Sequence, residues 1–280
     1  MPRGLELDIG LAGLALLRNW LVGDAETADR LLAEVRSLAV DGHPRAAPFS
    51  VPERDVDDAY YEWAPDYDSP RNPVFPAEAP AMLDLLREIP HGKALDAACG
   101  TGRQSLLLVG LGHTVIGVDR SPAMLEIARR ELPGTDFREG LLQSLPVADD
   151  SIDLVVCSLA LTHMENLLPP IREFARVLRP GGWIVLSDIH PMFIALSGQA
   201  AFRDREGNPS FVRNHRHWAS SYFEAFQAAS LKVERMVEAC YEPEHVGLMI
   251  GKGGPLSDFA VHAAFDGLPA VLLWSVRKPS

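Results

Sequence analysis

The sequence predicts an α/β fold built on a doubly wound, seven-stranded and mostly parallel sheet. From Pro76 onward, helical segments alternate with short runs rich in β-branched residues, which is the pattern of parallel βαβ units. The first of these runs leads through the glycine turn "CGTG" (residues 99–102) into a helix, and the second run ends at Asp119. In such a sheet, ligands bind at the carboxyl ends of the strands, where a turn of this kind lies.

The elements of the sheet follow one another in a simple order. Helices are expected near 77–89, 103–110, 122–132, 165–178 and 219–229. The seven strands are expected at 93–98, 114–119, 136–140, 152–160, 183–189, 231–239 and 270–278. An insertion without periodicity, at about 190–217, follows the fifth strand, and the aromatic runs around "REGNP" within it predict a hairpin.

Residues 1–57 are expected to form a separate N-terminal part. Apolar residues at helical spacing indicate one helix over 5–22 and, after a cap at Asp24, a second helix that ends at residue 39. The segment 41–57 contains three prolines and is expected to be a linker to the main domain, residues 58–280. The first helix is apolar on more than one side, so we interpret the helical hairpin as a lid or as a contact between the subunits of a homo-oligomer, with plain core packing as the alternative.

The composition limits the classes of partner. At 280 residues with 47% hydrophobic residues, the chain can bury a full core. Its formal net charge of −12 opposes binding to nucleic acid, which relies on clustered Lys and Arg. The apolar run near the N-terminus is too short to span a bilayer, so no membrane partner is expected. Three distant cysteines, Cys99, Cys157 and Cys240, form neither a metal pair nor a disulfide framework, which favours a reducing cytoplasm.

The glycine turn and two aspartates define the ligand that the sheet would bind. Gly100 and Gly102 let the backbone approach a ligand closely, next to a helix N-terminus that favours a negative group. Asp119 stands where a carboxylate can accept hydrogen bonds from both hydroxyls of a ribose. Asp96, four residues before Gly100, would repel a pyrophosphate and attract an ammonium group. A ligand with a ribose, an amino acid end and no phosphate fits, and S-adenosylmethionine has these properties.

Four ordered motifs resemble one known family. They are "LDAACGTG" (95–102), "VIGVDRSPAML" (115–125), "SLPVADDSIDLVVCSLALTH" (144–163) and "REFARVLRPGGWIVLSD" (172–188). Together they are similar to the class I S-adenosylmethionine-dependent methyltransferases, and particularly to the small-molecule branch of the ubiquinone and menaquinone C-methyltransferases. The resemblance implies a Rossmann-like fold with this cofactor.

The resemblance also implies which residues contact the cofactor. Asp119 would bind the ribose, Met124 would lie near the adenine, and the segment "DDAYYEWAPDYD" (57–68) would close over the methionine end through Tyr61 and Tyr67. Two positions depart from the family: Ala98 replaces the leading glycine of the first motif, and Leu141 replaces the acid that often receives the adenine amino group. The other expected contacts are Ala98, Arg120, Leu142, Gln143 and Leu159.

Two histidines are candidates for a catalytic base. His163 follows the fourth strand and His190 follows the fifth, so both are expected at the carboxyl edge of the sheet. An imidazole could accept a proton at neutral pH, but a histidine on a loop, as at His163, could equally be solvated or cap a helix. His215 and His217 lack a third and fourth ligand nearby, and no metal site is expected.

The function that follows is methyl transfer from S-adenosylmethionine to a small, largely apolar molecule, by direct attack of the acceptor on the methyl group. The helical hairpin and the insertion are similar in layout to bacterial natural-product methyltransferases, which implies an aromatic or alkaloid acceptor. One alternative is an NAD-dependent oxidoreductase, which Asp96 and the serine at the third glycine position, Ser105, oppose. Another alternative is a module that binds the cofactor without catalysis.

Overall fold

The computed structural model describes residues 3–40, 43–250 and 256–280, and it divides into two compact units. The larger one, here called the sheet unit, contains Glu53–Asp68, Glu78–Ala239 and Ala270–Ser280. The smaller one, here called the helical unit, contains Met1–Pro52, Ser69–Ala77 and Cys240–Pro269.

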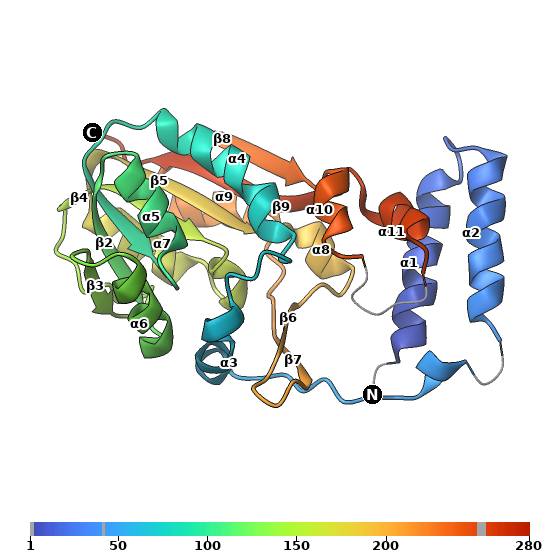
Figure 1. Ribbon diagram of the computed structural model, residues 1–280. Helices are drawn as coiled ribbons and strands as arrows, with labels where there is room; N and C mark the ends of the chain where they lie inside the picture. The colour runs from blue at the N-terminus through green and yellow to red at the C-terminus, as the bar shows by residue number, and fades with distance from the viewer. Residues whose placement is uncertain (1–2, 41–42, 251–255) are drawn as a thin grey trace. The chain divides into compact units, whose positions relative to one another are not determined.

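The sheet unit is built on a seven-stranded sheet in the order β3-β2-β1-β4-β5-β9-β8 (Figure 1). Strands β1 to β5 pair in parallel, whereas β9 pairs with β5 in antiparallel orientation, with Leu186 opposite Trp274. The predicted doubly wound and mostly parallel sheet is therefore confirmed. The strands are β1 (Lys93–Ala97), β2 (Thr114–Asp119), β3 (Asp136–Glu139), β4 (Ile152–Ser158), β5 (Leu178–Ile189), β8 (Lys232–Cys240) and β9 (Pro269–Arg277).

Strand β5 is longer than the predicted strand 183–189, because the "RPGG" segment joins the ladder instead of forming a separate turn. Gly181 N donates a hydrogen bond to Lys278 O at 3.0 Å, and Lys278 N donates to Gly182 O at 2.9 Å. These bonds with the end of the chain continue the pairing of β5 and β9 through the two glycines.

Helices cover the sheet according to the alternation of its side chains. Leu95 and Val155 belong to the main core together with Phe174 and Phe226, which come from two of the helices. On the opposite side of β1, Asp96 accepts a hydrogen bond from Ser105 of the helix that follows the glycine turn. Successive strand residues therefore face different helices, as a buried parallel sheet requires. The helices are α4 (Val74–Arg87), α5 (Arg103–Gly110), α6 (Pro122–Glu131), α7 (Leu168–Val177) and α9 (Ala219–Ala228).

The insertion after β5 contains a short helix, α8 (Pro191–Ala195), and the predicted hairpin. Strands β6 (Ala200–Arg203) and β7 (Pro209–Val212) pair in antiparallel orientation. The hairpin packs against α3 (Val56–Trp63), with Ala59 and Val212 buried and the rings of Trp63 and Phe202 stacked at 5.4 Å. The helix just before the core and the insertion therefore share a small apolar cluster.

The helical unit contains the predicted N-terminal hairpin of helices α1 (Gly4–Asn19) and α2 (Ala25–Leu38). Asp24 caps α2 by accepting a hydrogen bond from Thr27 N at 2.8 Å. The unit differs from the predicted residues 1–57, because its first segment ends at Pro52 and it also holds α10 (Pro243–Gly247) and α11 (Asp258–Phe265), two helices that the sequence does not predict. Ala15 and Leu31 are buried against Ala260 and Ala264, and Arg18 donates to the carbonyls of Ala263 and Ala264 at 3.2 and 2.7 Å.

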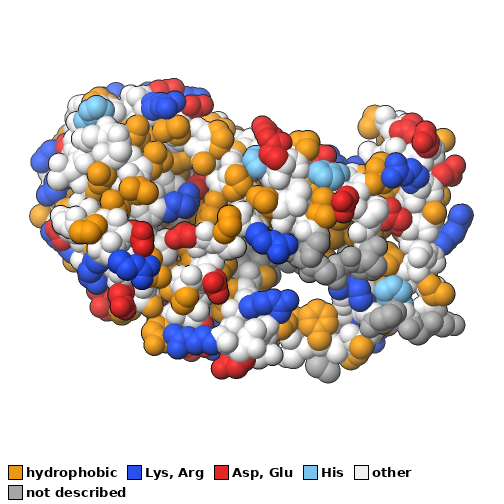
Figure 2. Space-filling model, viewed as in Figure 1, with side chains coloured by type: hydrophobic (Ala, Val, Ile, Leu, Met, Phe, Trp, Pro, Cys, Tyr) orange, Lys and Arg blue, Asp and Glu red, His pale blue; other side chains and the backbone are white. Residues whose placement is uncertain are grey.

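The surface charges and the lengths of the helices concern two classes of partner, nucleic acid and membrane. On the face shown in Figure 2, acidic and basic side chains are interspersed. Within the described ranges, no helix is both long enough and apolar enough to cross a membrane.

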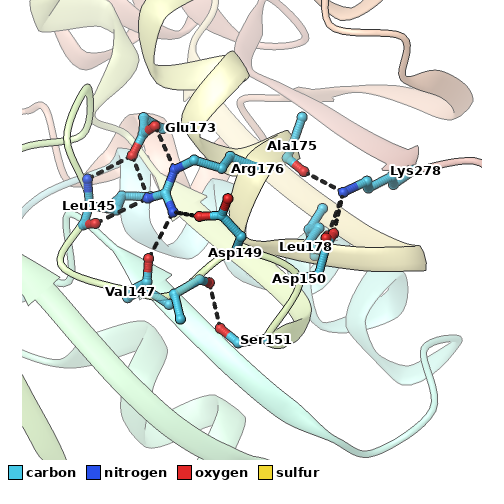
Figure 3. Close-up of polar contacts among 11 residues, drawn as sticks. Leu145, Val147, Asp149, Asp150, Ser151, Glu173, Ala175, Arg176, Leu178 and Lys278 are labelled. Carbon is cyan, nitrogen blue, oxygen red and sulfur yellow. Dashed lines mark hydrogen bonds and ion pairs between the residues drawn. The ribbon is translucent and has the colours of Figure 1, made fainter.

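A guanidinium fixes the loop that leads into β4. Arg176 of α7 donates hydrogen bonds to the carbonyls of Leu145 and Val147 at 3.1 and 2.9 Å, and it pairs with Glu173 and Asp149 (Figure 3). The hydrogen bonds that Arg176 donates to Glu173 and Asp149 raise the pKa of Arg176 above its usual range. One side chain therefore supplies the hydrogen-bond donors for two backbone carbonyls of the loop.

We expect Arg176→Met to lower the free energy of unfolding by about 1.5 to 3 kcal/mol, because two carbonyls and two carboxylates lose a charged partner. The matched control is Arg179→Met, which removes an ion pair with Asp153 between side chains that are 50% and 36% exposed. Such an exposed pair contributes about 1 kcal/mol or less. Urea unfolding of both variants measures the difference, and equal losses would contradict the role given to Arg176.

Candidate functional site

A cavity of about 330 Å³ opens at the carboxyl ends of β1, β2 and β4. This is the edge that the sequence predicts for ligand binding, and the volume lies at the lower end of the range for small-molecule sites. The structure brings most of the predicted site residues to its wall. They are Tyr67, Ala98, Gly100, Asp119, Arg120, Met124, Leu142, Gln143, Leu159 and His163.

The glycine turn shapes one side of the cavity. Ala98, Gly100 and Gly102 all have positive φ values, of 61°, 52° and 92°. A Cβ placed on Gly100 would meet nothing within 4 Å, so this residue leaves its backbone open to a ligand. Gly102 has a different role from the predicted one. It begins α5, and its Cβ position lies 3.4 Å from Ala128 of α6, so it allows two helices to pack and is not among the described residues that line the cavity.

Asp119 is held with both carboxylate oxygens oriented by the backbone. Oδ2 accepts from Gly100 N and Oδ1 accepts from Ser121 N, each at 2.8 Å. The side chain is almost fully buried, and burial raises its pKa while these amides oppose the shift. Each oxygen keeps a further lone pair, which leaves the carboxylate able to accept two hydroxyl groups.

Asp96 lies behind the turn and not at the cavity wall, contrary to the predicted contact with an ammonium group. Its Oδ2 accepts from Ser105 Oγ at 2.6 Å, and its Oδ1 is buried without a hydrogen-bond partner among the described residues. Burial raises the pKa of Asp96 to about 7. The alternation of β1 explains this placement, since Asp96 points to the face of the sheet that α5 covers.

A buried polar cluster that the sequence did not predict lies beside the turn. Glu78 of α4 accepts from the hydroxyls of Ser158, at 2.6 Å, and Ser187, and it pairs with Arg103 at 2.7 Å. Ser158 also lines the cavity. An acid within the apolar face of α4 is the only sign of this cluster in the sequence. The partners of Glu78 are 25 to 109 residues away, so the sequence alone does not identify them.

Apolar residues and an ion pair complete the far side. Val118, Met124 and Leu142 line the cavity near Asp119, and Leu141 occupies the place of the acid expected in the family. Arg120 pairs with Asp57 of α3, and both residues line the cavity. An adenine-sized ring would therefore meet mainly apolar side chains.

Tyr60, and not the predicted Tyr61, lines the cavity. Tyr61 is 54% exposed and lies under Arg205, whose guanidinium carbon is 4.6 Å from the ring centroid. The two residues are neighbours on α3, where each residue is rotated by about 100° from the last. The sequence therefore predicts the right helix but the wrong face.

His163 lies in the 3₁₀ turn η3 (Leu161–His163) and is bonded on both sides of its ring. Its Nδ1 is 3.2 Å from Arg213 O, and because a carbonyl can only accept, Nδ1 carries the proton. Its Nε2 then accepts from Tyr60 Oη at 2.6 Å. Burial lowers the pKa of His163 to about 4, so the imidazole is uncharged at neutral pH.

The end of the insertion holds this turn in place. His215 N donates to Thr162 O at 2.6 Å, and His217 Nε2 is bonded to Met164 O at 2.7 Å. Together with the bond from His163 to Arg213, these contacts pair residues 162–164 with residues 213–217. The alternating histidines therefore fix a turn, which the HxH spacing alone could not reveal.

His190 does not line the cavity, contrary to its predicted role as a candidate base. Its Nδ1 accepts from Met192 N at 3.2 Å, which caps α8, and its Nε2 is 3.1 Å from Glu238 Oε1. Both ring nitrogens are therefore used in structural contacts within the described part of the chain. Sequence position at the end of β5 could not distinguish a cap from a base.

The low pKa of His163 predicts an effect on stability. The unfolded histidine takes up a proton near its ordinary value of 6.5, whereas the folded one does so only near 4, so stability is lost as the pH falls between these values. We expect His163→Gln to lose less free energy of unfolding than the wild type over this interval. Urea titrations at several pH values measure this, and parallel pH profiles would show that His163 protonates normally in the fold.

Comparison with known proteins shows the family of the chain. The profile of a family described as a methyltransferase domain matches residues 95–186. A demethylmenaquinone methyltransferase of Renibacterium salmoninarum is 34% identical over 113 residues, which make up 40% of this chain and 48% of that protein. An uncharacterised methyltransferase of Oceanobacillus iheyensis is 33% identical in an alignment of 144 residues that covers 48% of this chain and 67% of that protein. The chain belongs to the class I S-adenosylmethionine-dependent methyltransferases.

Solved structures of class I methyltransferases share the fold. A crystal structure of an S-adenosylmethionine-dependent methyltransferase from Mesorhizobium loti is 25% identical, with a TM-score of 0.56, and covers 72% of this chain and 97% of its own. The chain spans about half the length of the first curated relatives that it matches, 48% and 41%. The chain therefore shares its fold with these methyltransferases, and its acceptor has to be argued from its own residues.

Proposed function

We propose that this methyltransferase transfers the methyl group of S-adenosylmethionine to a small, largely apolar acceptor. The observation that carries the proposal is a single cavity with Asp119 and the glycine turn on one side and with Tyr60, Tyr67 and His163 on the other. The first group fits a nucleoside with an amino acid end, and the second offers aromatic surface with few polar atoms. An aromatic acceptor, such as an alkaloid or another natural product, matches that surface.

The residues present fit the cofactor. Asp119 would hold the ribose hydroxyls, the apolar side chains of Met124 and Leu142 would contact the adenine, and the open backbone at Gly100 would face the amino acid end. The bound cofactor supplies an electrophilic methyl group on a sulfonium. The side chains of α3 would then exclude water and align the acceptor, and alignment provides a large part of the acceleration of such reactions.

The proposal is tested by two measurements on the same protein. Calorimetric titration with S-adenosylhomocysteine is expected to show binding, and incubation with methyl-labelled S-adenosylmethionine and small aromatic compounds is expected to give labelled products. Binding without transfer to any acceptor would favour the alternative of a catalytically silent module. Micromolar binding of NAD, with reduction seen at about 340 nm, would favour the oxidoreductase instead.

We further propose that the enzyme works in the cytoplasm. We also propose that its substrate is a small molecule and not nucleic acid, because its negative net charge of −12 opposes binding to a phosphate backbone. For the helical unit we propose a lid or a homo-oligomer contact, because Trp20, Leu21 and Val22 are 75%, 82% and 90% exposed. Sedimentation of Trp20→Ser against the wild type tests the contact: an unchanged sedimentation coefficient would exclude it.

A further inference from the structure

The acceptor side of the cavity ends in a hydrogen-bonded pair of side chains, Tyr60 and His163. Both residues line the cavity, and their polar atoms, Oη and Nε2, are 2.6 Å apart. The carbonyl of Arg213 fixes the proton of the imidazole on Nδ1, so the phenol is the donor and Nε2 is the acceptor. The direction of this hydrogen bond is therefore set by backbone outside the cavity.

This direction decides what Tyr60 can offer to a ligand. A phenol has one proton and two acceptor lone pairs, and the proton of Tyr60 already goes to His163. The oxygen can therefore only accept a further hydrogen bond, and the group best able to use it is a donor on the ligand. Glu165, which also lines the cavity, adds a second acceptor.

The surroundings keep both groups uncharged. Burial lowers the pKa of His163, with a smaller contribution from His215, and burial together with Tyr67, Asp119 and Asp188 raises the pKa of Tyr60. At neutral pH the pair is then a phenol bonded to a neutral imidazole. The Nε2 lone pair that accepts this hydrogen bond can take up the proton of the phenol.

We propose that Tyr60 and His163 form a proton relay for the hydroxyl group of an aromatic acceptor, which makes Tyr60 a catalytic residue and the reaction an O-methylation. This inference rests on the proposed function. The acceptor hydroxyl donates to Tyr60 Oη while the phenol proton of Tyr60 passes to His163 Nε2. The electron pair of the O–H bond stays on the acceptor oxygen, which bonds to the methyl carbon, and the sulfur keeps the electron pair of the broken C–S bond as a neutral thioether.

The charges of this step balance within the cavity. A positive sulfonium is lost when a positive imidazolium forms, so the total charge in the buried site does not change. A hydroxyl benefits most from such a relay, because it is a weak nucleophile until its proton leaves. A neutral amine attacks through its own lone pair and can release its proton afterwards.

The first test examines the relay without turnover. We expect ¹⁵N spectra of labelled histidine to show His163 protonated at Nδ1, with an Nε2 signal that shifts in Tyr60→Phe. The control Tyr61→Phe changes the exposed neighbour on the same helix and should leave the signal unchanged. A His163 protonated at Nε2, or a signal that does not respond to Tyr60→Phe, would overturn the relay.

The second test compares 2-naphthol with 2-naphthylamine as acceptors, with methyl-labelled S-adenosylmethionine. We expect Tyr60→Phe to lower kcat for 2-naphthol by about 10² to 10⁴ and to change transfer to 2-naphthylamine by less than about tenfold. The double variant Tyr60→Phe/His163→Gln should have a kcat for 2-naphthol only slightly below that of Tyr60→Phe, because the effects of substituting residues that act as a unit are not additive. Binding of S-adenosylhomocysteine should stay nearly unchanged.

The outcomes separate this inference from the proposed function. If the wild-type protein did not bind S-adenosylhomocysteine, the proposed function itself would be contradicted. Transfer to 2-naphthylamine alone, or equal effects of Tyr60→Phe on both acceptors, would contradict the relay and leave methyl transfer standing. Transfer to neither compound, by a protein that binds S-adenosylhomocysteine, would contradict an aromatic hydroxyl as the acceptor.

Discussion

Asp119→Ala is expected to weaken binding of S-adenosylhomocysteine by about ten- to a hundredfold. The carboxylate accepts from Gly100 N and Ser121 N, so it orients the glycine turn in addition to keeping lone pairs for the proposed contact with the ribose. Loss of a hydrogen bond to a charged group corresponds to about 1.5 to 3 kcal/mol, which gives this range of affinities. Asp119→Asn should have a smaller effect, because the amide keeps one oxygen acceptor.

Calorimetry of the two variants measures the difference, and Glu139→Gln is the matched control. Glu139 ends the neighbouring strand β3 in register with Asp119 but is exposed. If Asp119→Ala bound S-adenosylhomocysteine as tightly as Glu139→Gln, Asp119 would not be the ribose ligand. If Asp119→Asn were as weak as Asp119→Ala, the charge itself and not the hydrogen bonds would be responsible.

Asp119 could be predicted from the sequence because all its determinants are local. A buried strand, a glycine turn at a fixed distance and a helix capped by Ser121 place the carboxylate at the sheet edge without help from distant segments. The same holds for Gly100 and Met124, which the structure brings to the cavity wall. The connections within parallel βαβ units are short, so the geometry of this part of the fold can be predicted from neighbouring residues in the sequence.

The errors arise where the outcome depends on orientation or on distant contacts. The sequence predicts Tyr61 and not Tyr60, because only the packing of α3 on the hairpin decides which of the two adjacent rings faces inward. Asp96 and His190 are at the predicted strand positions, but hydrogen bonds from Ser105 and Met192 engage them in structural contacts. Helices α10 and α11 are short, with 5 and 8 residues, so their periodicity is weak.

Glu78→Ala is expected to lower the free energy of unfolding of the sheet unit by about 3 to 5 kcal/mol. Glu78 is fully buried, and its removal leaves the guanidinium of Arg103 without this carboxylate and leaves two serine hydroxyls without their acceptor. Removing one partner of a buried ion pair has a large effect because the other charge stays in a poorly solvated place. Asp84→Ala, which removes an exposed acid from the same helix, should change stability by less than about 0.5 kcal/mol.

The measurement can be confined to the sheet unit. Trp20 is in the helical unit, whereas Trp63, Trp183, Trp218 and Trp274 are in the sheet unit, so unfolding followed by fluorescence in a Trp20→Phe background reports the sheet unit alone. The double variant Glu78→Leu/Arg103→Met removes both charges and is expected to recover most of the lost stability, because no buried charge is then left without its partner. If the double variant were as unstable as Glu78→Ala, the loss would come from the two serine hydroxyls and the cavity left in α4, and the ion pair would not be what holds this helix to the cofactor edge of the sheet.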